Sequence, residues 1–171
     1  RFKLFLSLEF KVPVKQIEAL VLGGHGDNMV PLPQYTKISG KSLNTLISEG
    51  KISQERFNQI VQRTKDGGAE IGKLLGKSSA YYAPAAAGIE MAESYLKDQK
   101  KLLPCAAYLN GEYGVNNLYA GVPAIIGNKG VEKIEELSLN NIEKKQFEKS
   151  ISAVNNLWLS ACKIDSELKK S

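Results

Sequence analysis

The chain has 171 residues and a formal net charge of +5, with 43% hydrophobic and 24% charged residues. These proportions are typical of a globular protein of about one domain, and they exclude disordered and collagen-like chains. No apolar run approaches the ~18 residues of a membrane span, and the lysines are interleaved with acidic residues instead of forming the basic patch of a nucleic-acid binder. We therefore expect neither a membrane nor a nucleic acid as partner.

The first half of the chain predicts short strands between helices. The boundaries of these elements follow from the spacing of apolar residues and from the Pro and Gly residues at their ends. Two helices are expected to begin after N-cap residues, Ser42 and Ser53. In chain order we expect a mostly buried helix over residues 2–10, a helical turn over 13–17, strands over 19–22 and 35–39, and helices over 42–50 and 53–76. Gly67 and Gly68 lie inside the last of these helices, and such a pair weakens a helix unless another element packs closely against it.

The second half predicts a long helix, an antiparallel meander and a final helix. In chain order we expect a helix over residues 84–96, strands over 102–109, 118–126 and 131–137, and a helix from about 141 to 165. Glycine-containing turns separate these strands, and we expect the polar tail after Asp165 to fray. The predicted fold class is therefore α+β, with long helices packed on an antiparallel sheet.

The only histidine of the sequence lies just past a predicted strand, in Val21-Leu-Gly-Gly-His25-Gly-Asp27. The flanking glycines allow a ligand or another backbone to approach closely, and an imidazole gives or takes a proton near neutral pH. Two interpretations fit this spacing: a catalytic acid–base group, or a loop histidine that is hydrogen-bonded to Asp27.

Other candidate residues have a structural explanation as well as a functional one. A guanidinium at Arg1 grips a carboxylate through two parallel hydrogen bonds, whereas a single terminal arginine is more commonly a solvated charge. Ser78 and Ser79 precede a predicted helix, where hydroxyls and amides either bind an anion or cap the helix. For the Tyr81-Tyr82 pair we predict a place in the core rather than a contact with a cofactor.

Several motifs are absent from the sequence. It contains no G-x-G-x-x-G and no G-x-x-x-x-G-K-[ST], so it carries neither a dinucleotide fingerprint nor a phosphate loop. No cluster of metal ligands surrounds His25, and we predict no metal site. Cys105 and Cys162 lie far apart without a C-x-x-C spacing, which argues against a disulfide framework and indicates a reducing compartment, the cytoplasm.

Several stretches resemble the malate/lactate dehydrogenase family. Leu22-Gly-Gly-His-Gly-Asp-Asn-Met-Val-Pro-Leu32 is similar to the family's active-site histidine loop, and Arg1-Phe-Lys-Leu-Phe-Leu is similar to the helix after its aspartate–x–x–arginine motif. The stretches that resemble its substrate domain are Ile89–Asp98, Tyr113–Pro123 and Ile126–Glu132. The resemblance is nearest to bacterial malate dehydrogenases of the lactate-dehydrogenase-like type, because lactate dehydrogenases usually carry glutamate where this sequence has Gly24.

This resemblance implies a reaction and a role for each matching residue. The reaction is NAD-dependent interconversion of (S)-malate and oxaloacetate, in which hydride passes between the substrate C2 and the nicotinamide. His25 is then the proton donor and acceptor at the C2 oxygen, and Arg1 binds the C1 carboxylate. The positions that line the substrate pocket are Ser78, Ser79 and Ala80, and the position near the nicotinamide ring is Pro84.

The resemblance also implies that residues 1–171 are a single C-terminal substrate-binding domain. The NAD-binding domain, the aspartate that orients the histidine and the loop that selects malate or lactate then precede Arg1. The family forms homodimers and homotetramers, and we expect the isolated chain neither to turn over malate nor to bind NAD tightly.

Three alternatives stay open. The chain is a lactate dehydrogenase of the same family; or it is a non-catalytic module that folds or oligomerises; or, on the +5 charge alone, it binds anions or nucleic acid.

Overall fold

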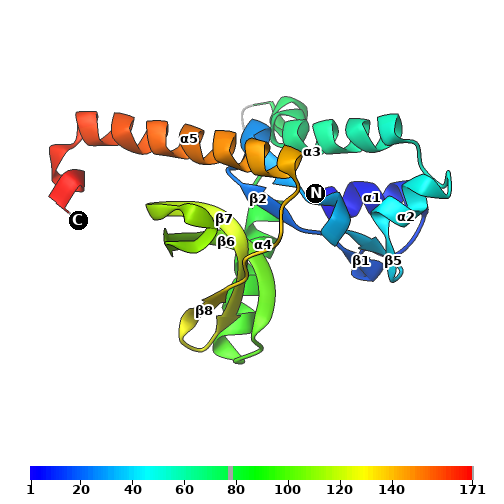
Figure 1. The fold of residues 1–171 in the computed structure, drawn as a ribbon, viewed down its shortest axis with the longest axis horizontal. Coiled ribbons are helices and arrows are strands. Elements are labelled where there is room, and N and C mark those ends of the chain that lie inside the picture. Colours follow the sequence, from blue (N-terminus) through cyan, green and yellow to red (C-terminus); the bar gives the residue numbers. More distant parts are fainter. Residues whose placement is uncertain (77–78, 171) are drawn as a thin grey trace.

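The computed structural model describes residues 1–76 and 79–170 (Figure 1). The α-helices in these ranges are α1 (Phe2–Phe10), α2 (Leu43–Ser48), α3 (Gln54–Leu75), α4 (Tyr82–Leu96) and α5 (Asn141–Ile164). The strands are β1 (Ile17–Glu18), β2 (Val21–Gly23), β3 (Met29–Pro31), β4 (Lys37–Ile38), β5 (Lys41–Ser42), β6 (Lys101–Asn110), β7 (Asn116–Gly127) and β8 (Gly130–Ile134).

The long strands build one antiparallel sheet in the order β3-β2-β7-β6, with β8 paired to β7. Strands β6 and β7 pair from Lys101 opposite Ile126 to Asn110 opposite Asn116, and β7 turns back into β8 beside Gly127 and Gly130. The predicted meander is therefore confirmed. A smaller sheet joins β1, β4 and β5, and the fold is α+β, as predicted.

The two early strands are shorter than predicted. The first, expected over residues 19–22, begins at Val21, and of the second, expected over 35–39, only Lys37–Ile38 is a strand. Pro33 opens a 3₁₀ turn over Pro33–Tyr35 instead. The fixed φ of proline suits a first helical position, and proline has no N–H to give to a sheet.

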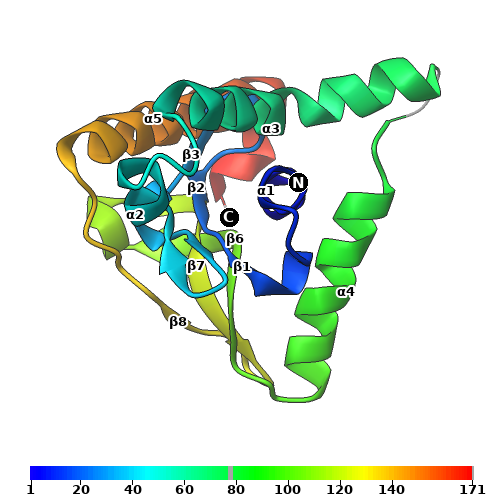
Figure 2. The same cartoon turned by 90° about the vertical axis from the view of Figure 1, so that its right-hand side faces the viewer.

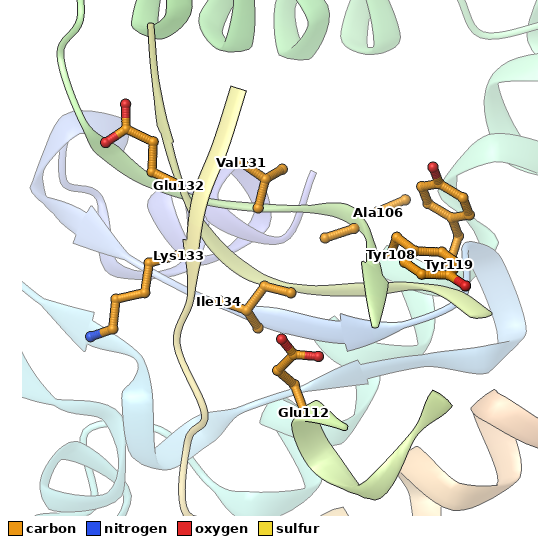
Figure 3. A pocket seen from close by; sticks show the side chains of 9 residues that line it. Ala106, Tyr108, Glu112, Tyr119, Val131, Glu132, Lys133 and Ile134 are labelled. Atoms are coloured by element: carbon orange, nitrogen blue, oxygen red, sulfur yellow. The ribbon is translucent and has the colours of Figure 1, made fainter. Parts of the chain in front are cut away.

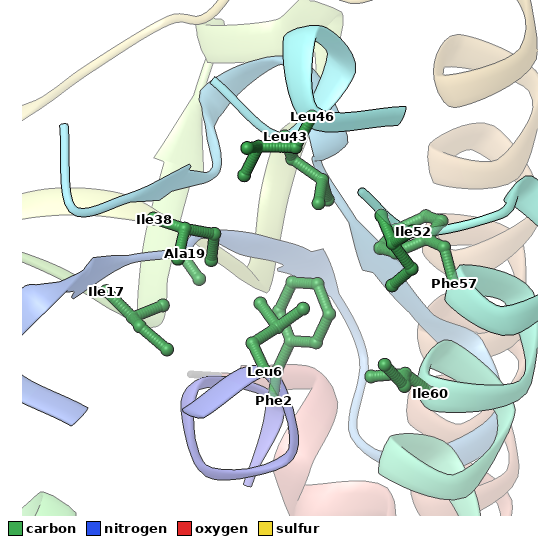
Figure 4. Packing of buried hydrophobic residues seen from close by; sticks show 10 residues of the cluster. All are labelled: Phe2, Leu6, Ile17, Ala19, Ile38, Leu43, Leu46, Ile52, Phe57 and Ile60. Atoms are coloured by element: carbon green, nitrogen blue, oxygen red, sulfur yellow. The ribbon is translucent and has the colours of Figure 1, made fainter. Parts of the chain in front are cut away.

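One hydrophobic core lies between α1, α2, α3 and the small sheet (Figure 4). Phe2 and Leu6 point into it from α1, and the Phe2 ring centroid lies 6.3 Å from that of Phe57 on α3. Leu4 and Leu8 lie on the opposite side of α1 and are 46% and 62% exposed, so the predicted burial of this helix is correct for one face only. The core holds the start of α1, and with it Arg1, against α3.

A second core lies between the large sheet and α5. Leu22 of β2 and Val122 of β7 are buried in it beneath Phe147 of α5. Helix α5 begins where predicted, because Asn140 and Glu143 form a reciprocal capping box that satisfies backbone N–H groups at the helix start. This core joins α5 to the strand that ends just before His25.

The tail after α5 forms a 3₁₀ helix over Ser166–Lys170, and its fraying stays a prediction. The Asp165 carboxylate accepts a hydrogen bond from the backbone N–H of Glu167 at 2.9 Å. The Asp165 side chain thus gives a hydrogen-bond partner to an N–H group of the first turn, which has none within the helix.

Helix α4 stands away from the other helices (Figure 2) and is exposed along nearly its whole length. Its attachment is Ser94, which is fully buried and donates its hydroxyl to the Ile126 carbonyl at 2.6 Å. Tyr81 and Tyr82 are 51% and 79% exposed and contact each other, with ring centroids 4.7 Å apart. The predicted place of this pair in the core is therefore wrong, because nothing in the described chain covers the start of α4. Among the described helices, none is long and apolar enough to cross a membrane.

Candidate active site

His25 is carried by a tight loop at the end of β2. Gly23 ends the strand with φ of +80°, and Gly26 follows the histidine with φ of +72°. Positive φ favours glycine, because in other residues the Cβ atom crowds the residue's own backbone there. A 3₁₀ turn over Gly26–Asn28 then leads into β3. The loop leaves the His25 side chain exposed, two residues past the end of β2.

Arg1 reaches His25 from the start of α1. The half-buried guanidinium places Nη2 at 2.8 Å from the Nε2 atom of His25. A guanidinium has only donors, so Nε2 accepts this hydrogen bond and the imidazole carries its proton on Nδ1. The structure thus joins two of the predicted site residues, and the hydrogen-bond partner found for His25 is Arg1 rather than Asp27.

The glycine pair of α3 makes room for this contact. A Cβ atom at Gly67 would lie 2.9 Å from Arg1 Cδ and 3.2 Å from Arg1 Nη1, and a Cβ at Gly68 would lie 3.3 Å from Nη1 and 3.9 Å from His25 Cε1. The Arg1 guanidinium therefore packs directly against the backbone of α3. The condition that a glycine pair needs a closely packed neighbour is met by Arg1.

One donor of Arg1 is left without a partner. Nη1 is buried and has no hydrogen-bond partner in the described chain, which costs about 1–3 kcal/mol for a buried polar group. The two Nη atoms of a guanidinium match the two oxygens of a carboxylate in a bidentate pair. The arrangement therefore suits an anion with two coplanar oxygens at Arg1, beside the imidazole.

Two adjoining cavities flank the pair. One, of about 460 Å³, is lined by Arg1 together with residues of β1, β2 and β6 and with Glu90 of α4. The other, of about 360 Å³, is lined by His25 together with mostly apolar residues of β2, β6, β7 and α5. Val21 and Pro104 line both, so a small molecule at Arg1 has space on either side.

The remaining predicted residues lie elsewhere. Ser78 is outside the described residues. Ser79 and Ala80 lie in the connection between α3 and α4, and Pro84 is exposed in the first turn of α4. The linings of the two cavities, as far as the chain is described, come from other segments.

A residue that the sequence reasoning missed is Ser150 of α5. Its Oγ accepts a hydrogen bond from the Gly24 N–H at 2.7 Å and donates one to the Asn28 carbonyl at 2.7 Å. The signal was present in the sequence, because Ser150 is a polar residue on the apolar stripe that runs through Phe147 and Val154. Its partners are more than a hundred positions away, and sequence spacing alone does not connect them.

A third cavity, of about 430 Å³, lies over the far part of the large sheet (Figure 3). Tyr108 and Tyr119 meet edge to face there, with ring centroids 5.3 Å apart. The charged residues of its lining are Glu112, Glu132 and Lys133. Lys133 is already paired with Glu135 at 2.6 Å. Neither Arg1 nor His25 lines this cavity.

The described residues contain no group of three or more His, Cys, Asp or Glu that could hold a metal ion. Cys105 and Cys162 are both free thiols, half-buried and buried respectively. Burial raises the pKa of the Cys105 thiol, which keeps it protonated and poorly nucleophilic. The functional groups that the structure brings together beside these cavities are the Arg1 guanidinium and the His25 imidazole.

Comparison with known proteins gives one consistent result. A family model described as the lactate/malate dehydrogenase alpha/beta C-terminal domain matches residues 1–158. Malate dehydrogenase of Pelagibacter ubique is 68% identical over 170 residues, which are 99% of this chain and 53% of that protein. The chain thus spans about half the length of the curated relatives it matches.

Solved structures agree with this match. Malate dehydrogenase from Salinibacter ruber is 44% identical, with a TM-score of 0.91 over 98% of this chain and 53% of that one. Lactate dehydrogenase from Eimeria maxima, solved with NADH and oxamate, is also 44% identical, with a TM-score of 0.92 over 97% of this chain and 52% of that one.

Proposed function

Because this chain belongs to the lactate/malate dehydrogenase family and matches its C-terminal domain, we propose that it is the substrate-binding and catalytic half of an NAD-dependent malate dehydrogenase. The whole enzyme would interconvert (S)-malate and oxaloacetate. The observation that supports this most directly is the 2.8 Å contact between Arg1 Nη2 and His25 Nε2, with the buried Nη1 beside it. A cation for a carboxylate and a group that moves a proton lie within reach of one small substrate.

In malate oxidation, Arg1 binds the C1 carboxylate. Two carboxylate oxygens give Nη1 a partner and replace His25 as the partner of Nη2. Nε2 of His25 is then free to accept the proton of the C2 hydroxyl, while C2 loses hydride and becomes the carbonyl carbon of oxaloacetate. NAD, when bound, supplies the hydride acceptor. In the reverse direction His25 returns the proton to the C2 oxygen.

From this chain we assign only Pro84 to the cofactor. It is exposed and apolar at the start of α4, as the face of a nicotinamide ring requires. The sequence has no dinucleotide fingerprint, so we propose that the rest of the NAD site belongs to a half of the enzyme outside residues 1–171. We propose Ser78, Ser79 and Ala80 as the pocket lining, on the connection between α3 and α4.

Malate is favoured over lactate as substrate by two observations. The curated relative at 68% identity is a malate dehydrogenase, and Gly24 stands where lactate dehydrogenases usually carry glutamate. The solved structures do not separate the two, because the malate and the lactate dehydrogenase are both 44% identical. The proposal further includes a homodimer or homotetramer of the whole enzyme, and a cytoplasmic location that the free thiols of Cys105 and Cys162 support.

The test is a chimera in which this chain replaces the matching half of Pelagibacter ubique malate dehydrogenase. We expect the chimera to form NADH from malate, and the 171-residue chain alone to form none and to bind NAD weakly. In the chimera, His25→Asn removes the proton acceptor and is expected to lower kcat about 10²- to 10⁴-fold.

Different outcomes separate the alternatives. The chimera tests the reaction class and not malate against lactate, because the loop that selects between these substrates comes from the Pelagibacter ubique half. A folded chimera without activity toward either substrate supports a non-catalytic module, and a His25→Asn variant with an unchanged rate contradicts the mechanism.

A further inference from the structure

A single side-chain hydroxyl, that of Ser150, bridges the two ends of the loop that carries His25. Ser150 Oγ lies 2.7 Å from the Gly24 nitrogen and 2.7 Å from the Asn28 oxygen. These two backbone groups stand on either side of His25, so the bonds span the loop from its first residue to its last. Ser150 itself is only 1% exposed, and helix α5 fixes its position.

Both hydrogen bonds need a hydroxyl. The Gly24 N–H is a donor and the Asn28 carbonyl is an acceptor, so the group between them must accept from one and donate to the other. A serine hydroxyl does both. Alanine does neither, and it would leave two backbone groups without partners in a partly buried place.

The surroundings leave little freedom for another arrangement. A Cβ atom at Gly23 would collide with Ser150 Oγ and lie 2.9 Å from the Asn28 carbonyl oxygen. On its other side, a Cβ at Gly121 of β7 would collide with the carbonyl of Gly23, where β2 and β7 pair. The end of β2 is therefore held between β7 and α5, and Ser150 is the polar contact from the α5 side.

We propose that Ser150 is a positioning residue for His25, an inference that rests on the proposed function. It acts on the proton-transfer step by holding the imidazole where the C2 oxygen of the substrate lies. The carboxylate contact of Arg1 is made from α1 and α3 and does not pass through Ser150. Loss of Ser150 therefore affects turnover more than substrate binding.

The test compares Ser150→Ala with Ser152→Ala in the chimera described above. Ser152 is an exposed serine on the same helix and donates its hydroxyl to the Glu148 carbonyl within α5, so it is a matched control for the loss of a hydroxyl. Because a displacement of about 1 Å at a reacting group costs up to about 100-fold in rate, we expect Ser150→Ala to lower kcat about 10- to 100-fold. The KM for malate should stay within about threefold, and Ser152→Ala should change neither.

Hydrogen exchange provides a second measurement that needs no variant. The Gly24 amide of the unmutated chain is expected to exchange slowly, although His25 beside it is exposed. If Ser150→Ala fails to fold, this measurement decides, and exchange of Gly24 as fast as in an unstructured peptide overturns the proposal.

Other outcomes also overturn it. An unchanged kcat in folded Ser150→Ala does so, and so does an effect confined to KM. If the unmutated chimera has no malate activity, the proposed function fails, and Gly24 protection then still reports whether Ser150 holds the loop.

Discussion

Substitution of Gly67 by alanine separates the stability of α3 from the placement of Arg1. The added Cβ would lie 2.9 Å from Arg1 Cδ and 3.2 Å from Arg1 Nη1. Real Cβ atoms essentially never lie within 3.0 Å of such an atom, so the contact with Cδ requires one side to move. Helix α3 is held by its own hydrogen bonds and by Phe57 and Ile60 in the core, whereas the arginine side chain rotates about several single bonds. We therefore expect Arg1 to move and the helix to stay.

The two effects have opposite signs. In a helix interior alanine is more favourable than glycine by about 0.8–1.0 kcal/mol, and the displaced side chain offsets part of this gain. The free energy of unfolding should therefore stay unchanged or rise by up to about 1 kcal/mol. A displaced guanidinium loses its charge-assisted bonds to the substrate carboxylate, worth about 1.5–3 kcal/mol, which corresponds to a loss of about 10- to 150-fold in affinity.

Urea unfolding of the 171-residue chain measures the first effect, and the KM for malate in the chimera measures the second. Gly88→Ala is the matched control, because Gly88 lies inside α4 and a Cβ there meets nothing within 4 Å. It should gain stability through the same helix propensity and leave KM unchanged.

Two results would refute this reasoning. If Gly67→Ala leaves KM at the unmutated value, the contact between α3 and Arg1 does not hold the guanidinium. If Gly67→Ala destabilises the chain by several kcal/mol while Gly88→Ala stabilises it, the helix has moved in place of the side chain.

Three further predictions test other parts of the structure. Arg1→Lys keeps the charge but loses the two-pronged geometry, and steady-state kinetics of the chimera should show KM for malate about 10- to 100-fold higher with a smaller change in kcat. Gly23→Ala should destabilise the chain by more than about 2 kcal/mol in urea unfolding, because the positive φ of Gly23 and its close neighbours both exclude a Cβ atom. The control is Gly24→Ala, which should be nearly neutral, because a Cβ at Gly24 has ordinary contact distances. The hydrogen bond from Arg56 lowers the pKa of Glu9, so this pair contributes stability above the ordinary carboxyl range and loses it as the pH falls through the lowered pKa. In Glu9→Gln, this part of the acid dependence of unfolding should be absent.

Features set by neighbours in sequence were predicted well. Ser42 and Ser53 were expected as N-caps, and each side-chain oxygen accepts the backbone N–H three residues on, at 3.1 and 3.0 Å. The antiparallel meander followed from apolar runs separated by glycine-containing turns. In these cases the physical cause lies within a few residues, so one sequence contains it.

Features set by distant segments were predicted poorly. Tyr81 and Tyr82 are apolar enough for a core, but burial depends on what covers α4, and the described chain offers nothing to do so. In the sequence, Ser150 is only a polar residue that interrupts an apolar stripe, and its hydrogen bond with Gly24 is seen only in the fold. The roles proposed for His25 and Arg1 came from the family resemblance. Spacing alone left His25 open between a catalytic group and a structural loop histidine, and it favoured a solvated charge at Arg1.

The site depends on missing side chains as much as on present ones. Arg1 lies against α3 only because Gly67 has no Cβ, and β2 meets β7 only because Gly121 has none. A search for chemistry-bearing residues passes over such positions, since glycine offers neither a charge nor a proton. Yet a single added carbon at Gly67 is expected to shift the guanidinium without unfolding the helix, whereas one at Gly23 is expected to destabilise the chain. The difference follows from what the carbon meets, which is a flexible side chain in the first case and a buried hydroxyl and a backbone carbonyl in the second.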